Sequence, residues 1–113
     1  MLKSVSELVA EAADTVERIS IEVALKIENV VVVDVREPQE ASQRPIVGSI
    51  NIPRGVLEMK ITELAQDSST PICVHCASGV RATLAAEQLA RLGFTNVKAI
   101  SSGIDDILSA IGG

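Results

Sequence analysis

The chain has 113 residues, which is enough for one domain with its own hydrophobic core. Hydrophobic residues make up 47% and charged residues 22%, so a disordered or fibrous chain is excluded, and the core must be aliphatic because Phe94 is the only Phe, Tyr or Trp. The formal net charge of −5 argues against nucleic acid or an anionic membrane as a partner.

The sequence also carries signals about its compartment. It contains no apolar run of about 18 residues that could span a membrane. Acidic residues recur from Glu7 to Glu17, so the N-terminus lacks the hydrophobic segment of a signal peptide. The two cysteines, Cys73 and Cys76, lie too close together to organise a secreted disulfide framework. We therefore expect a cytoplasmic location.

Two helices are predicted before the first strand. Ser4 and Glu7 have the spacing of a capping box, and apolar residues follow at helical intervals, which predicts an amphipathic helix over residues 5–18. Ser20 can cap a second, short helix that extends to about residue 26.

The rest of the chain alternates strands with helices. The β-branched run over residues 30–35 is apolar on both faces, which predicts a buried parallel strand. Two further strands are expected over residues 72–75 and 97–101. Helical segments are expected at a turn starting with Pro38 and over residues 56–64, 80–92 (closed by Gly93) and 104–111, while residues 43–53 are loop-like around a short apolar stretch.

This alternation predicts an α/β fold, with right-handed crossovers and a mostly parallel sheet flanked by helices on both faces. We divide the chain into an N-terminal helical segment, residues 1–19, and a single domain, residues 20–113. In such sheets the binding crevice lies beyond the carboxyl ends of the strands. The strand over residues 72–75 ends directly before Cys76, so chemistry is expected there.

Six consecutive residues after that strand combine a nucleophile with groups that bind anions. A helix N-terminus presents free N–H groups and partial positive charge, which favour a thiolate and a bound anion. A glycine lets the backbone turn so that successive N–H groups point inward. A serine hydroxyl can donate a hydrogen bond, and an arginine adds a planar guanidinium that is always charged. The six residues are Cys76, Ala77, Ser78, Gly79, Val80 and Arg81.

Thiolate activation alone does not explain this loop. The nucleophilicity of a thiolate falls as its pKa falls, so the net gain in rate is only a few-fold. The larger task must be to hold an anionic donor and to stabilise the departing anion.

These residues resemble the rhodanese family in order and spacing. The matching motifs are Asp34-Val35-Arg36-Glu37-Pro38, Gly48-Ser49-Ile50-Asn51-Ile52-Pro53, the loop from Cys76 to Arg81, and the closing Ser102-Gly103-Ile104. The resemblance covers about residues 20–110, and it is specific because several motifs match in order.

The resemblance implies a single-domain sulfurtransferase with a rhodanese-like fold. Cys76 would take sulfur from thiosulfate, become a persulfide and pass the sulfur to cyanide or a thiol, without a metal or organic cofactor. The N–H groups of residues 77–81 would bind the donor, and Asp34 and Arg36 would support the site rather than react. A sulfur-relay protein is a further possible partner.

The sequence departs from the family pattern at three places. Arg44 and Pro45 stand where members usually carry Gly-His, Ile107 replaces the usual aromatic residue near the C-terminus, and Ser102 replaces the first glycine of the closing pair. These changes bear on donor preference and on the rim of the pocket.

Several alternatives were weighed against this interpretation. The Cys73–Cys76 spacing also fits a redox pair or half of a zinc site with His75, but Cys73 lies within a predicted strand and is expected to pack in the core. His75 should be a structural histidine on the opposite face from Cys76. A phosphatase is disfavoured because only four residues separate Cys76 from Arg81, a shorter loop than in cysteine phosphatases.

Two questions stay open at this stage. Arg81 can bind the donor directly, or it can pair with Asp34 and hold the loop in shape. The domain can act on free thiosulfate, or it can be a carrier module that receives persulfide sulfur from another protein and reacts poorly with thiosulfate.

Overall fold

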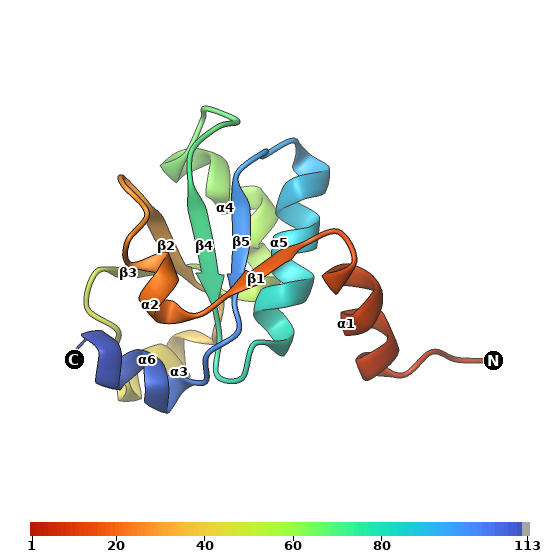
Figure 1. Ribbon diagram of the computed structural model, residues 1–113, viewed down its shortest axis with the longest axis horizontal. Coiled ribbons are helices and arrows are strands. Elements are labelled where there is room, and N and C mark those ends of the chain that lie inside the picture. The colour runs from red at the N-terminus through yellow and green to blue at the C-terminus, as the bar shows by residue number, and fades with distance from the viewer. Residues whose placement is uncertain (112–113) are drawn as a thin grey trace.

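The computed structural model describes residues 1–111, so the last two residues of the predicted domain, Gly112 and Gly113, lie outside the described part. Its centre is a five-stranded sheet in the order β1-β5-β4-β2-β3, with every neighbouring pair parallel (Figure 1). The strands are β1 (Glu17–Ile19), β2 (Val31–Asp34), β3 (Ser49–Asn51), β4 (Ile72–His75) and β5 (Val97–Ile100). The predicted α/β class is confirmed.

Helices cover both faces of the sheet (Figure 1). They are α1 (Val5–Ala13), α2 (Ile21–Ala24), α3 (Pro38–Gln43), α4 (Leu57–Leu64, after a 3₁₀ turn over Arg54–Val56), α5 (Val80–Leu92) and α6 (Ile104–Ile111). One core cluster joins α4 and α5 to the sheet, and a second joins α2 and α6 to its other face. The helix α1 packs against α5. The loop after β4 and the helix α3 lie at the carboxyl end of the sheet.

Several local signals acted as predicted. The capping box of Ser4 and Glu7 is formed on α1, and the Ser20 side chain accepts a hydrogen bond from the Val23 amide at the start of α2. The helix α5 has the predicted bounds and ends at Gly93, whose φ of 117° lies in the left-handed region that favours glycine. Strands formed in all three segments where apolar runs predicted them.

Two predictions about the sheet edges were wrong. The first helix ends at Ala13 instead of continuing to residue 18, because residues 17–19 form β1 and pair with β5. The segment predicted as a loop over residues 43–53 contains β3, which pairs with β2. Both strands have only three residues, too few to establish a hydrophobic period, and pairing with a neighbour decides their conformation.

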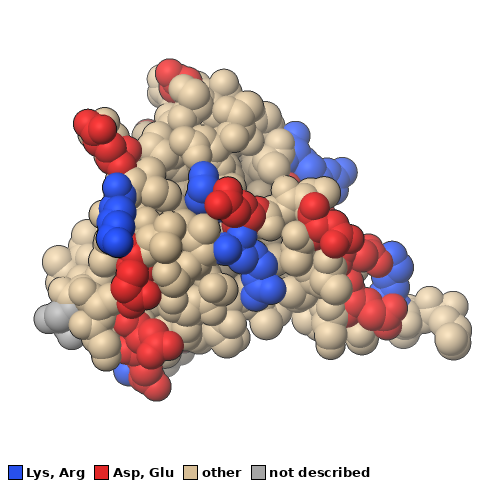
Figure 2. Space-filling view, in the orientation of Figure 1, with Lys and Arg blue, Asp and Glu red and all other residues tan. Residues whose placement is uncertain are grey.

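The surface is mainly acidic. Figure 2 shows acidic side chains gathered on α1 and along the edge of the molecule near α6, with basic side chains interspersed among them. Within residues 1–111, no helix combines the length and the hydrophobicity needed to cross a membrane.

The packing of α5 gives a direct test of the fold. Leu89 is fully buried in the core cluster beneath α5, whereas Leu92 of the same helix is 50% exposed. We expect Leu89→Ala to lower the free energy of unfolding by about 2–5 kcal/mol, because it leaves a cavity. Leu92→Ala should cost less than about 1 kcal/mol. Urea unfolding of both variants tests this, and equal losses would contradict the assigned face of α5.

Candidate active site

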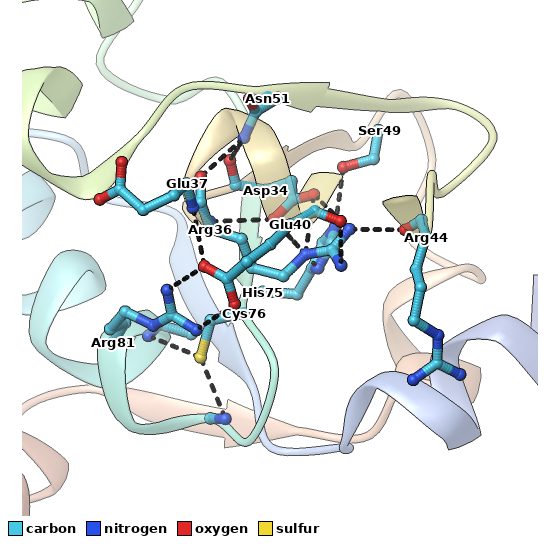
Figure 3. Close-up of polar contacts among 12 residues, drawn as sticks. Asp34, Arg36, Glu37, Glu40, Arg44, Ser49, Asn51, His75, Cys76 and Arg81 are labelled. Carbon is cyan, nitrogen blue, oxygen red and sulfur yellow. Dashed lines mark hydrogen bonds and ion pairs between the residues drawn. The ribbon is translucent and has the colours of Figure 1, made fainter. Parts of the chain in front are cut away.

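Cys76 lies at the turn between the end of β4 and the start of α5. Its Sγ accepts hydrogen bonds from two backbone amides, that of Gly79 at 3.1 Å and that of Ala82 at 3.3 Å (Figure 3). The residue is only 1% exposed. Amide donors at a helix N-terminus stabilise a thiolate more than a neutral thiol. The geometry therefore gives Cys76 the surroundings of a nucleophile.

Gly79 gives the loop its curl. Its φ is 90°, in the left-handed region where a side chain is strained. A Cβ at this position would also lie 3.4 Å from the carbonyl oxygen of Ser101. Within residues 1–111, the amides of Val80 and Arg81 donate to no protein acceptor. They remain available for a bound anion beside the thiol.

The closing motif, residues 102–104, is hydrogen-bonded to the loop that holds Cys76. The Ile104 amide donates to the carbonyl oxygen of Ala77 at 2.9 Å, and Ser102 Oγ accepts a hydrogen bond from the Ile21 amide at 3.0 Å. The serine that replaces the first glycine of this motif thus satisfies an otherwise free donor at the start of α2. The loop after β4 and the segment after β5 support each other.

Arg81 pairs with Glu40 rather than with Asp34. Its Nη1 and Nη2 donate to Glu40 Oε1 and Oε2 at 2.7 and 3.0 Å, so the pair is bidentate. The possible pair with Asp34 is not formed, because Asp34 is turned to Arg36. Figure 3 shows Arg81 and Glu40 next to Cys76. The hydrogen bond to Glu40 raises the pKa of Arg81 above its ordinary value.

Asp34 and Arg36 form a buried ion pair at the end of β2. Arg36 Nε and Nη2 donate to the Asp34 carboxylate at 2.7–3.1 Å, and both side chains are 3% exposed. The Arg36 amide also donates to Asp34 Oδ1 at 3.0 Å. Within the described residues neither side chain has a polar contact with Cys76. The pair therefore makes no direct contact with the sulfur, and its supporting role stays a prediction.

The pair also fixes the segments around it. Arg36 Nη1 and Nη2 donate to the carbonyl oxygens of Glu40 and Arg44, at 3.4 and 2.8 Å, which holds α3 at the carboxyl end of the sheet. Asn51 Nδ2 donates to the carbonyl oxygens of Asp34 and Arg36, both at 2.9 Å. The orientation of α3 and of β3 thus depends on one buried guanidinium and one amide.

His75 is fully buried and faces away from Cys76. Alternation along β4 puts Cys76 in the core cluster under α5 and His75 on the opposite side, as predicted. Its Nε2 shares a 2.7 Å hydrogen bond with Ser49 Oγ. Its Nδ1 lies 3.9 Å from Asp34 Oδ1 and has no hydrogen-bond partner within residues 1–111.

The grouping of Ser49, His75 and Asp34 does not form a catalytic triad. The His75–Asp34 separation is too long for the hydrogen bond that orients a base, and the Asp34 carboxylate is already bound to Arg36. Burial lowers the pKa of His75, with Arg36 adding to this effect and Asp34 opposing it. The ring is therefore neutral, in keeping with a structural histidine.

Cys73 is separated from Cys76 by the sheet. It packs in the core cluster with α2 and α6, whereas Cys76 belongs to the other cluster. Burial raises the pKa of Cys73 to about 11, so its thiol stays protonated and unreactive. This confirms the predicted packing position, and it removes the geometry that a redox pair or a shared metal would need.

Sequence reasoning missed Glu40, Ser49 and Asn51. Ser49 and Asn51 lie in the matching motif of residues 48–53, which gave them no individual role. Glu40 had a local signal, because it stands three residues after Glu37 and closes a capping box with the Glu37 amide at 3.0 Å. Its contact with Arg81 joins residues 41 positions apart and has no sequence pattern.

The other two departures from the family pattern also have a place in the structure. Arg44 pairs with Asp105 of α6 at 2.6 Å, so it links the loop after α3 to the last helix. Ile107 is fully buried in the core cluster with α2 and α6.

The fold and the site together define a parallel α/β domain with a cysteine cradled at a strand-to-helix turn. The rhodanese-like domain family matches residues 20–110 of the sequence. The chain belongs to this family of sulfurtransferases.

Individual relatives differ in what their names describe. The chain is 32% identical over 75 residues to the thiosulfate sulfurtransferase PspE of Escherichia coli, covering 66% of this chain and 71% of that protein. It is 33% identical over 79 residues to YrkF of Bacillus subtilis, named as a candidate sulfur carrier, covering 70% of this chain but only 42% of that protein. A solved structure from Rhodopseudomonas palustris, described as of unknown function and possibly a tyrosine phosphatase, superposes with a TM-score of 0.87 at 27% identity, covering 100% of this chain and 94% of that chain.

The buried histidine generates a prediction about pH. The folded-state pKa of His75 lies below the unfolded value near 6.5, so the unfolded chain takes up the proton first as the pH falls. Stability is then complete above about pH 6.5 and declines below it. We expect the free energy of unfolding to drop by about 1 kcal/mol between about pH 7.5 and about pH 5.5.

His75→Gln is the matched variant, since His75 is the only histidine of the chain. Urea unfolding of this variant should give nearly the same free energy at both pH values, whatever its absolute stability. An equally steep pH dependence in the variant would show that another group titrates in this range.

Proposed function

We propose that this domain transfers sulfane sulfur from thiosulfate to a thiophilic acceptor, cyanide or a thiol, through a persulfide on Cys76. The observation that carries the proposal is the pair of amide hydrogen bonds, from Gly79 and Ala82, to the Sγ of a cysteine at a helix N-terminus. Membership of the rhodanese-like family and the similarity to PspE support the same activity.

The chemistry has two steps that balance without a further reactant. The Cys76 thiolate attacks the outer sulfur of thiosulfate, a new S–S bond forms, the S–S bond of the donor breaks, and sulfite leaves with the electron pair. Cyanide then attacks the outer sulfur of the persulfide and leaves as thiocyanate, which regenerates the thiolate. A thiolate acceptor leaves as a persulfide in the same way. No metal or organic cofactor is needed for either step.

The loop residues have distinct roles in this scheme. The free amides of Val80 and Arg81 would bind the sulfonate oxygens of the donor, helped by the Ser78 hydroxyl, which is exposed. The same donors stabilise the negative charge of the persulfide and of the departing sulfite. Gly79 and Ala77 hold the loop in the required shape. Since Cys76 must be in its reduced form at the start of each cycle, we propose a reducing compartment, the cytoplasm.

A second candidate is a persulfide carrier that receives its sulfur from another protein. It is favoured by one specific observation, that the Arg81 guanidinium is already neutralised by Glu40 and so adds little attraction for a free dianion. The similarity to YrkF, covering less than half of that protein, points the same way. Both candidates use Cys76 as the carrier.

The sulfur-loading step is directly testable by intact mass. After incubation with thiosulfate and removal of the excess, we expect the mass to rise by one sulfur atom and to return to its starting value when cyanide is added. Cys76→Ser should abolish both changes. Cys73→Ser should keep them, at some cost in stability, because Cys73 lies in the other core cluster.

An unchanged mass in reduced, folded protein would favour the protein-fed carrier. Loss of loading in a folded Cys73→Ser variant would restore the two-cysteine redox alternative.

Phosphate-ester hydrolysis provides a test against the phosphatase alternative. With four residues between Cys76 and Arg81, and with Arg81 bound to Glu40, the loop is expected to be too small and too well neutralised for a phosphate group. No turnover of an aryl phosphate should be detected under conditions where sulfur transfer is measurable. Turnover that disappears in Cys76→Ser would show that this argument from loop size is wrong.

A further inference from the structure

Arg81, the cation of the loop that holds the proposed nucleophile, is already paired. Both terminal nitrogens of Arg81 donate to the two carboxylate oxygens of Glu40. This is the end-on, two-bond geometry in which a guanidinium also binds sulfonate or phosphate oxygens. A donor that binds to the same two nitrogens of Arg81 must therefore displace the Glu40 carboxylate.

The Glu40 carboxylate is held in position by its own helix. The carboxylate Oε1 accepts a hydrogen bond from the Glu37 amide at 3.0 Å. The backbone carbonyl oxygen of Glu40 accepts one from Arg36 Nη1. The Arg81 hydrogen bond lowers the pKa of Glu40 to about 2, with the Glu37 amide adding to the effect, so the group is ionised throughout the range in which enzymes work. A fixed negative charge thus stands beside the loop that holds Cys76.

The pair can nevertheless be exchanged. Its side chains are 36% and 39% exposed, and an ion pair of this kind contributes little to stability because water competes for both groups. Thiosulfate carries two negative charges, delocalised over its outer sulfur and its three oxygens, and both are repelled by the Glu40 carboxylate. A monoanionic donor meets about half of that repulsion.

We propose that Glu40 is a specificity-determining residue that competes with the sulfur donor for Arg81, and so selects monoanionic donors of the organic thiosulfonate or persulfide type over the dianion thiosulfate. This inference rests on the proposed transfer through Cys76 and names the class of donor that the site prefers. Arg81 then acts as a donor-binding residue only after Glu40 has been displaced.

The test compares two donors that react in the same way. Thiosulfate releases sulfite, and methanethiosulfonate, in which a methyl group replaces one charged oxygen, releases methanesulfinate. Glu40→Gln removes the charge but retains the capping box, since glutamine serves at that position. We expect kcat/KM for thiosulfate to rise about fivefold, mainly through a lower KM, and the ratio of thiosulfate to methanethiosulfonate to rise about threefold.

Glu58→Gln is the matched control. It removes the same charge from a partly exposed pair, Arg54–Glu58 at 2.9 Å, whose side chains make no hydrogen bond to Arg81, Glu40 or Cys76 within residues 1–111. Its donor ratio should equal that of the unchanged protein, and the melting temperatures of both variants report on folding. A donor ratio that is unchanged or lower in Glu40→Gln overturns the proposal for Glu40 while leaving transfer through Cys76 intact. If the unchanged protein takes sulfur from neither donor, the proposed function and this inference both fail.

Discussion

The buried ion pair between Asp34 and Arg36 is the interaction on which the site depends. Removing two charges from water costs several kcal/mol per ion, and the cost is recovered only when every polar group finds a partner. Here the Arg36 guanidinium satisfies one carboxylate and two carbonyl oxygens, those of Glu40 and Arg44. Because those carbonyls belong to α3 and the residue after it, satisfying the buried charge also fixes α3 across the carboxyl end of the sheet. The position of Glu40 beside Arg81 follows from this.

The site provides positive potential in a protein of net charge −5 mainly through its backbone. The amides of Gly79 and Ala82 point at the sulfur, and the two amides between them are unused within the described part of the chain. Backbone donors of this kind cost no side-chain entropy and do not change with pH. The Arg81 side chain of the same loop is balanced by Glu40. In the proposed function, the cradle would therefore attract an anion through its backbone amides.

Much of the fold was predictable because its signals are local. Capping residues lie within three positions of the amides whose hydrogen bonds they accept. The central strands are β-branched or apolar runs, which can be recognised without knowing which strands they pair with. The helix α5 was bounded correctly for these reasons, between the glycine of the loop and Gly93. The edge strands β1 and β3 failed as predictions, since three residues carry no period and only the hydrogen bonds of β5 and β2 make them strands.

The sequence by itself predicted Cys76 as the nucleophile and determined the amide cradle around it, because Cys76, Gly79 and the start of α5 are contiguous and the geometry of the cradle depends on backbone conformation alone. Only the tertiary structure decided the partner of Arg81. The order of strands places β2 beside β4, so the helix that follows β2 meets the loop that follows β4. Arg81 could have paired with either of two acidic residues, Asp34 or Glu40. The buried Arg36 pairs with Asp34, so Arg81 pairs with Glu40. That choice reflects the cost of burying an unpaired charge, which no spacing in the sequence encodes.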